Sequence, residues 1–204
     1  MSDTKEKILL TALMLFAADG YEAVSVSDIA GRLGMTKGAL YRHYKSKRDI
    51  FDSIVSRMFE LDAQRAQEHD VPQDSFDAAP EQYRQVKLSD LKEFAIAQFD
   101  FWTKDEFASN FRKMLALEQY RNPEMNKLYQ DCIVSGCVGY VEDIMREMMA
   151  CGIVRQAEPK QLAVEFFAPM FLLIAMSDGQ NFELDAKAIL AAHIDRFVEN
   201  YAVQ

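Results

Sequence analysis

Apolar residues recur at helical spacing almost from one end of the chain to the other. The first predicted helix shows the pattern, because each of its apolar residues has another three or four positions away and they would share one helix face: Ile8, Leu9, Ala12, Leu13 and Phe16. Strand-like alternation of apolar and polar residues is scarce. The pattern predicts an all-α protein of about nine helices. The first four helices begin near residues 3, 25, 36 and 46, and the others cover about 90–104, 105–121, 123–150, 160–179 and 185–202.

Helix-capping signals divide the N-terminal part into short elements. Ser25 and Asp28 have the Ser-x-x-Asp spacing of a helix start, whereas Gly20 and Gly34 are typical of helix ends. The second helix is therefore about two turns long, and the third follows at once, from about Thr36 to Tyr44. Two short helices that are joined by a tight glycine-containing turn and packed on a third form a helix-turn-helix, a DNA-docking unit.

Two further segments interrupt the regular pattern. Residues 71–89 contain two prolines and many polar side chains without a clear period, which predicts a long loop. The longest uninterrupted apolar run, from Phe166 to Met176, contains Pro169 and has 11 residues. Such a run is too short to span a bilayer and predicts a buried helix.

Charge is distributed unevenly along the 204 residues. The net charge is −9, but residues 1–48 hold eight Lys/Arg and five Asp/Glu, which gives +3, and the remainder holds 15 and 27, which gives −12. Between Ile29 and Arg48 there are six Lys/Arg, one His and no acidic residue. The basic charge thus coincides with the predicted helix-turn-helix, where phosphate binding needs it.

The start of the chain, Met-Ser-Asp-Thr-Lys, lacks the pattern of a signal peptide. The three cysteines, Cys132, Cys137 and Cys151, are odd in number and lie in predicted helices. We therefore expect a reduced, cytoplasmic protein.

The third helix has a face suited to the major groove. On a helical wheel Leu40 and Tyr44 point inward, Tyr41 lies on the flank, and Ala39, Arg42 and His43 point outward, so these three are expected to reach base edges. Thr36 can offer its hydroxyl and backbone N–H to a phosphate, and Gly38 lets the backbone approach DNA. Lys37 falls on the inward side of the wheel.

Residues 21–51, YEAVSVSDIAGRLGMTKGALYRHYKSKRDIF, resemble the signature of tetracycline-repressor-type (TetR) regulators. The resemblance lies in the Ser-x-x-Asp-Ile-Ala start, the Gly-x-Thr-Lys-Gly-x-Leu-Tyr segment and the following Tyr-Lys-Ser-Lys. It implies a DNA-binding domain at 1–48 and a helical effector-binding and dimerisation domain at 49–204. It also implies a variable, sequence-selecting position at Arg42. The positions that usually contact DNA in this family are Ser25, Thr36, Lys37, Gly38, Tyr41, His43 and Lys47.

In this family the helical domain that follows the helix-turn-helix determines which effector binds. The resemblance implies that the effector here is a small apolar or aromatic ligand. Aromatic side chains are dense between residues 94 and 120, and ligand pockets are mainly apolar with a few polar groups. For each residue, packing in the core remains the competing interpretation. The candidate ligand-binding residues are Phe99, Trp102, Phe107, Asn110, Phe111, Met114, Tyr120, Tyr129 and Tyr140.

The last two predicted helices, near 160–179 and 185–202, are where such proteins usually form a two-fold interface. A homodimer would hold two third helices about one DNA turn apart, which predicts a palindromic operator. We expect no cofactor, no metal, no membrane and no catalytic residue. The apolar surface expected at the interface is supplied by Phe166, Phe167, Met170, Phe171, Ile174, Ile189, His193, Phe197 and Tyr201.

Three other functions compete with a ligand-controlled repressor. An enzyme is disfavoured because no Ser-His-Asp order, Gly-rich phosphate loop or His-Glu-x-x-His motif is present. A thiol redox sensor is disfavoured because Cys132 and Cys137, five residues apart in one helix, would diverge by about 140°. A DNA-binding regulator controlled by a protein partner, with no small-molecule pocket, shares the DNA-binding domain and stays open.

Overall fold

The computed structural model describes residues 3–72, 76–179 and 183–203. The regular secondary structure of the described residues is helical, with no strand except an isolated antiparallel bridge between Val154 and Ala202. This confirms the all-α class. The chain forms two compact units. Unit 1 comprises the described residues up to Asp62 together with Asp105–Tyr129, and unit 2 comprises Ala63–Lys104 and the described residues from Gln130 onward.

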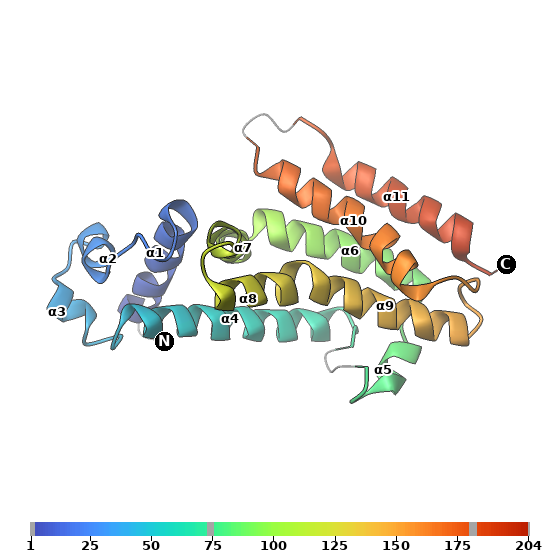
Figure 1. Cartoon of the computed structure of the whole chain (residues 1–204), viewed down its shortest axis with the longest axis horizontal. Helices are drawn as coiled ribbons and strands as arrows, with labels where there is room; N and C mark the ends of the chain where they lie inside the picture. Colours follow the sequence, from blue (N-terminus) through green and yellow to red (C-terminus); the bar gives the residue numbers. More distant parts are fainter. Residues whose placement is uncertain (1–2, 73–75, 180–182, 204) are drawn as a thin grey trace. The chain divides into compact units, whose positions relative to one another are not determined.

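Unit 1 contains the N-terminal helices and a segment from the middle of the chain (Figure 1). Helix α1 contacts both α2 and α7, and α2 contacts α3. The apolar face of α1 is fully buried at Ile8, Leu9, Ala12 and Phe16, as its spacing predicts. The elements are α1 (Asp3–Asp19), α2 (Val26–Arg32), α3 (Lys37–Leu40), most of α4 (Lys47–Glu68), α7 (Glu106–Glu118) and the start of α8 (Pro123–Ile133).

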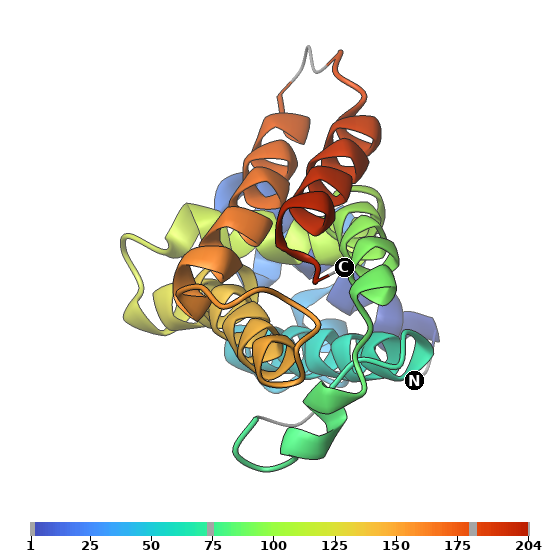
Figure 2. The ribbon, with the colours of Figure 1, turned by 90° about the vertical axis from the view of Figure 1, so that its right-hand side faces the viewer.

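Unit 2 is built around α10, which contacts α9, α11 and α6 (Figure 2). The last two helices lie side by side, and α11 also contacts α6. Two ion pairs fix α6 to α11, Lys92 with Asp195 at 2.5 Å and Lys187 with Asp100 at 2.7 Å. The elements that lie wholly in this unit are α5 (Pro80–Arg84), α6 (Leu88–Lys104), α9 (Ser135–Ala150), α10 (Pro159–Ser177) and α11 (Ala186–Tyr201).

The predicted helix 123–150 is wrong as one element, because the chain breaks at Val134 between α8 and α9. Val134 has φ −121° and ψ −93°, outside the helical region. A side chain at Gly136 would place its Cβ 1.9 Å from the carbonyl oxygen of Asp131, so only glycine allows this close approach. The Ser135-Gly136 pair is the sequence signal for the break, since such pairs often mark helix kinks.

The predicted loop 71–89 also differs in part, because α5 lies within it. Pro80 stands at the start of this helix, where its fixed φ is favourable and no hydrogen bond is lost. Tyr83 is 3% exposed, and Arg84 pairs with the buried Glu147 of α9 at 2.9 Å. Burial of one aromatic ring and one ion pair thus anchors a segment that has no helical period of its own.

By length and composition alone, α10 is apolar enough to cross a membrane. In unit 2 its side chains Leu162, Phe166 and Met170 are buried, as expected of a core helix. Its other face carries exposed apolar residues, among them Val164 and Leu172, at 46% and 59% exposure.

The compact units do not follow the boundary that we predict between the DNA-binding domain and the body. Unit 1 continues past residue 48 through most of α4 and includes α7. The predicted boundary is a functional division, and it remains a prediction.

Candidate nucleic-acid interface

The turn between α1 and α2 is set by a glycine and a capping box. Gly20 has φ +90°, a left-handed conformation that suits glycine, and its N–H donates to the carbonyl of Phe16 at 3.0 Å. At the start of α2, the Asp28 N–H donates to Ser25 Oγ at 3.2 Å and the Ser25 N–H to Asp28 Oδ2 at 2.8 Å. The hydrogen bonds from Ser25 lower the pKa of the Asp28 carboxyl.

The second turn places the third helix as predicted. Gly34, at φ +65°, ends α2, and Thr36 Oγ1 accepts the Ala39 N–H at 3.2 Å at the start of α3. The α-helix is shorter than expected, from Lys37 to Leu40, and a helical turn continues to His43. A helix of four residues has a small dipole, so a phosphate at Thr36 would be held mainly by the hydroxyl and the first N–H groups.

Except at Lys37, the buried and outward residues of this segment are those that the helical wheel predicts. Leu40 and Tyr44 are buried, at 0% and 1% exposure. The Tyr44 hydroxyl donates to the Lys5 carbonyl in the first turn of α1 at 3.3 Å, and burial raises the pKa of Tyr44 to about 12. Arg42 is exposed, and Ala39 and His43 are half-buried on the outer side. We call Ala39, Arg42 and His43 the reading face.

Exposed cations lie on the reading face and beside it in the sequence. Arg42 of the reading face, with Arg32 and Lys45, is exposed, and within the described part of the chain none of the three forms a hydrogen bond or an ion pair through its side chain. These three charges are available to phosphates without breaking an internal contact. Arg32 is absent from the predicted contacts, although it is the one basic residue of α2 and lies in the basic stretch 29–48.

The helical wheel predicts the wrong side for Lys37. Its side chain is exposed rather than inward, and its ammonium lies 5.8 Å from the centre of the Tyr41 ring. Tyr41 itself is 44% exposed. The wheel misplaces Lys37 because a residue in the first turn of a helix can turn its long side chain away from the core.

Lys47 and Arg48 are engaged within unit 1. Lys47 Nζ donates to the Tyr21 carbonyl at 2.8 Å and lies 4.2 Å from the centre of the Tyr21 ring. Arg48 donates to both oxygens of Glu124 at 2.6 Å and to Asp52 at 2.6 Å. The predicted DNA contact of Lys47 stays a prediction, and any phosphate would compete with its bonds to the turn.

Gly31 and Gly38 have open surroundings. Both are exposed, and a Cβ added to either would meet no atom within 4 Å in the described chain. Packing of the protein therefore does not require glycine at position 38. These open surroundings agree with the expectation that Gly38 lets the protein backbone approach DNA closely.

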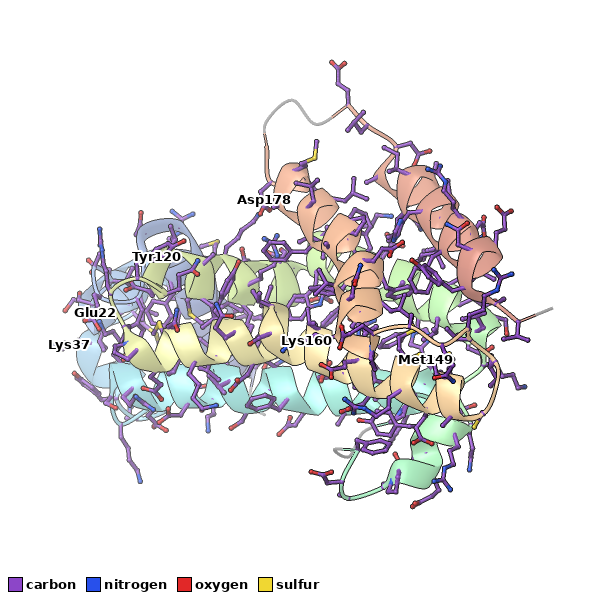
Figure 3. All side chains as sticks on the ribbon, turned by 45° about the vertical axis from the view of Figure 1, so that its right-hand side comes forward. Glu22, Lys37, Tyr120, Met149, Lys160 and Asp178 are labelled. Atoms are coloured by element: carbon purple, nitrogen blue, oxygen red, sulfur yellow. The ribbon has the colours of Figure 1, made fainter. Side chains whose placement is uncertain are left out.

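The predicted ligand-binding residues are divided between the two units. Phe99, Trp102 and Tyr140 belong to unit 2, and the other six belong to unit 1. Phe111 and Met114, on α7, are fully buried. Tyr120 corrects an expectation, because it follows the last turn of α7 and its side chain is 88% exposed (Figure 3). Asn110 and Tyr129 are half-buried.

Tyr140 belongs to a chain of aromatic rings within unit 2. Its ring centre lies 5.9 Å from that of Tyr83 and 6.4 Å from that of Phe94. His69 extends the chain, 5.9 Å from Phe94. An open, polar hollow in this unit contains none of the predicted ligand residues. It is lined by Ala66, Gln67, Asp70, Val71, Pro72, Gln82, Gln85, Lys87 and Asp90.

The predicted interface residues are wrong in part. Phe166, Phe167, Met170, Ile174 and Phe197 are buried within the chain itself, at 8% exposure or less, so they are not available to a second copy. Of the predicted set Ile189 is exposed, at 42%.

The cysteines also differ from the sequence-based expectation. Because the helix breaks at Val134, the angle expected between Cys132 and Cys137 in one continuous helix does not apply. The Cys137 thiol donates to the Cys132 carbonyl at 3.2 Å, and none of the three cysteines forms a disulfide within the described residues. Within the described ranges no group of three or more His, Cys, Asp or Glu is placed to hold a metal.

The helix-turn-helix segment is similar to that of known regulatory proteins. Residues 8–54 match the model described as "Bacterial regulatory proteins, tetR family". The repressor BepR of Brucella suis is 41% identical over 56 residues, which are 28% of this chain and 27% of BepR. The regulator AcrR of Shigella flexneri is 42% identical over 52 residues, 26% of this chain and 24% of AcrR. The chain thus matches about a quarter of the length of these relatives.

Solved structures resemble the whole chain in fold. SmeT, the repressor of a multidrug efflux pump of Stenotrophomonas maltophilia, is 22% identical with a TM-score of 0.66, covering 100% of this chain and 92% of SmeT. A regulator from Saccharomonospora viridis, solved with choline, is 23% identical with a TM-score of 0.64, covering 100% of both chains. Identities this low show the fold alone.

Proposed function

We propose that the chain is a cytoplasmic transcriptional repressor of the tetR family, which a small apolar or aromatic molecule releases from its operator. The reading face carries this proposal. Buried Leu40 and Tyr44 fix a helical turn whose outer side presents Arg42 and His43. An exposed arginine can form a bidentate hydrogen bond to guanine, and the cations around it can bind phosphates.

A second copy of the chain is the proposed partner of the α10–α11 face. On α10 the exposed residues Val164, Ala168, Leu172 and Met176 lie four apart, so they form one stripe without charge. Exposed Ile189 on α11 lies beside Ala188 and Ala192, which are also exposed. Burial of such a stripe against its symmetry mate would stabilise a dimer and hold two reading faces about 35 Å, or a multiple of it, apart.

Control by a small molecule is supported by the relatives. SmeT has been solved with triclosan, and another structural neighbour is described as a flavonoid-responsive regulator. In this chain α7 supplies the largest group of predicted ligand residues, Phe107, Asn110, Phe111 and Met114. A ligand acts as a switch only if it favours the form that cannot bind the operator, and a 100-fold preference corresponds to about 2.7 kcal/mol.

A thermal-shift screen tests ligand control directly. Triclosan, a flavonoid and choline would be added to the purified protein, and each compound that raises Tm would then be added to a protein–operator gel shift. A ligand at 100 times its Kd stabilises the fold by about 2.7 kcal/mol. We expect at least one compound to raise Tm and to release the operator. Operator binding unaffected by every stabilising compound would contradict ligand control and favour control by a protein partner.

A further inference from the structure

Glu118 is a buried carboxylate that the proposed function leaves unexplained. It lies in the last turn of α7, and its side chain is 3% exposed. Its Oε1 accepts the backbone N–H of Glu22 at 3.3 Å, and its Oε2 is buried with no hydrogen-bond partner among the described residues. A carboxylate in this position is costly, because burial disfavours its charge and the C-terminal end of a helix repels it.

The donor of this hydrogen bond belongs to the turn that leads into the helix-turn-helix. Glu22 lies between Gly20, which ends α1, and Ser25, which caps α2 (Figure 3). Gly20 lies against the same oxygen, since an added Cβ would be 2.6 Å from Glu118 Oε1. The φ of +90° favours glycine at position 20, and any other side chain would also displace the Glu118 carboxylate.

The same region of the chain makes a second contact to the DNA-binding helices. We call residues 118–124 the α7–α8 corner. Its backbone turns where the N–H groups of Arg121 and Asn122 both donate to the Glu118 carbonyl at 2.9 Å. At its other end Glu124 accepts both hydrogen bonds of Arg48, at the start of α4. The corner thus holds the α1–α2 turn with one carboxylate and the start of α4 with another.

We propose that Glu118 is a positioning residue for DNA binding, through which α7 sets the α1–α2 turn and with it the orientation of α2 and α3. The proposal rests on the proposed function, because it names the residue by which the body of the protein acts on the reading face. A buried glutamate at position 118 lowers the stability of the fold, but an apolar residue there would leave the backbone N–H of Glu22 without its acceptor.

Two substitutions separate positioning from a merely structural role. Glu118→Gln keeps an oxygen that can accept the Glu22 N–H, whereas Glu118→Leu removes the acceptor and fills the space with apolar atoms. The operator for these measurements is the duplex that the wild-type protein selects from a random pool. We expect E118Q to bind this operator as tightly as the wild-type protein does. We expect E118L to keep or raise Tm, to exchange the Glu22 amide hydrogen faster, and to bind the operator roughly tenfold more weakly.

Binding of a random duplex at the same salt concentration is the control, and E118L should match wild type there. Equal loss on both duplexes, or an unchanged operator affinity in E118L, would overturn the proposal. Failure of the wild type to select any duplex would instead refute the proposed function, while the amide exchange of Glu22 would still report the contact.

Alanine substitutions at two glycines, Gly20 and Gly34, test the same contact even if E118L does not fold. Gly20→Ala drives a methyl group against Glu118, whereas Gly34→Ala, also at positive φ, meets no atom within 4 Å. We expect G20A to lower Tm more than G34A, and the excess to disappear when G20A is combined with Glu118→Ala, which removes the contacting oxygen, but not with E118Q, which keeps an atom there. An excess that persists in the G20A/E118A double variant would contradict contact between Gly20 and Glu118.

Discussion

Gly38 and Gly31 are exposed glycines on neighbouring short helices. A comparison of the two distinguishes a glycine required for folding from one required for DNA binding. Neither has an atom within 4 Å of the position that a Cβ would occupy. Alanine is a better helix former than glycine, so the fold alone would favour alanine at both positions. A glycine at position 38 is consistent with close approach of the DNA backbone to α3.

Gly38→Ala should therefore raise the free energy of unfolding by about 0.5 kcal/mol and yet weaken operator binding about tenfold. Gly31→Ala is the matched control, with the same gain in stability and no loss of affinity. Chemical denaturation and gel shifts measure the two quantities. If G38A binds the operator as tightly as G31A does, DNA does not approach α3 at this point.

Arg42 and Lys45 differ in what they are expected to contribute. Arg42→Ala should cost about 1–3 kcal/mol on the operator and much less on random DNA, because a base contact is lost. Lys45→Ala should weaken both alike and reduce the slope of log K against log salt by about 1. Titrations at several salt concentrations would show this. Equal losses on both duplexes in R42A would remove Arg42 as a base reader.

Lys47 is a poorer test of phosphate binding than its position in the sequence indicates. Its ammonium also holds the carbonyls of Tyr21 and Glu22, at 2.8 and 3.4 Å. Lys47→Ala should therefore lower the free energy of unfolding by about 1 kcal/mol, besides any effect on DNA. The sequence predicts the charge of this residue but not its contacts, which depend on the fold around the α1–α2 turn.

At the scale of elements, local signals predict the helix-turn-helix well. Gly20, the Ser25–Asp28 capping box and Gly34 each act on neighbouring residues, and the structure confirms all of them. Elements that depend on distant contacts are predicted less well. Helix α5 is held by burial of Tyr83 and by the ion pair of Arg84 with Glu147. The local sequence pattern does not predict either contact.

The contact between α4 and α8 predicts a pH dependence. Hydrogen bonds from Arg48 lower the pKa of Glu124 below its ordinary value of 4.5. A carboxyl whose pKa is lower in the folded state stabilises the fold above its unfolded pKa, and that contribution disappears as the pH falls through the folded value. The Tm difference between wild type and Glu124→Gln should thus be largest near neutral pH and shrink below about pH 4.5.

Glu60→Gln is the control for this measurement, because Glu60 is an exposed carboxylate of α4 without an ion pair among the described residues. Its effect on Tm should be small at every pH. A Tm difference for E124Q that stays constant down to pH values of about 3 would show that the Arg48–Glu124 pair contributes nothing.

At the scale of the whole molecule, the sequence predicts which helices should form the dimer but not which side chains. Spacing alone does not show which apolar face of α10 packs inside the chain, because both faces of this helix are apolar. Phe166 and Met170 pack inward, so Leu172 and Val164 are the exposed residues. The ligand site is less predictable still, since a ring in the core and a ring beside a ligand have the same sequence pattern.

Leu172→Glu should convert the proposed dimer to a monomer, since two charges would face each other across the symmetry axis. Operator affinity should fall at least about a hundredfold, because each half-site would be bound alone. Leu10→Glu, at another exposed leucine, is the control and should remain dimeric. Sedimentation would report the mass, and a dimeric L172E variant would place the interface elsewhere.

The sequence of the DNA site tests the central claim most directly. The wild-type protein would be used to select duplexes from a random pool, and the enriched sequences would be aligned and footprinted. Two reading faces related by two-fold symmetry predict an inverted repeat with half-site centres one helical turn of about 35 Å, or a multiple of it, apart. A pool without enrichment, or a single half-site bound by one copy of the chain, would contradict a dimeric repressor.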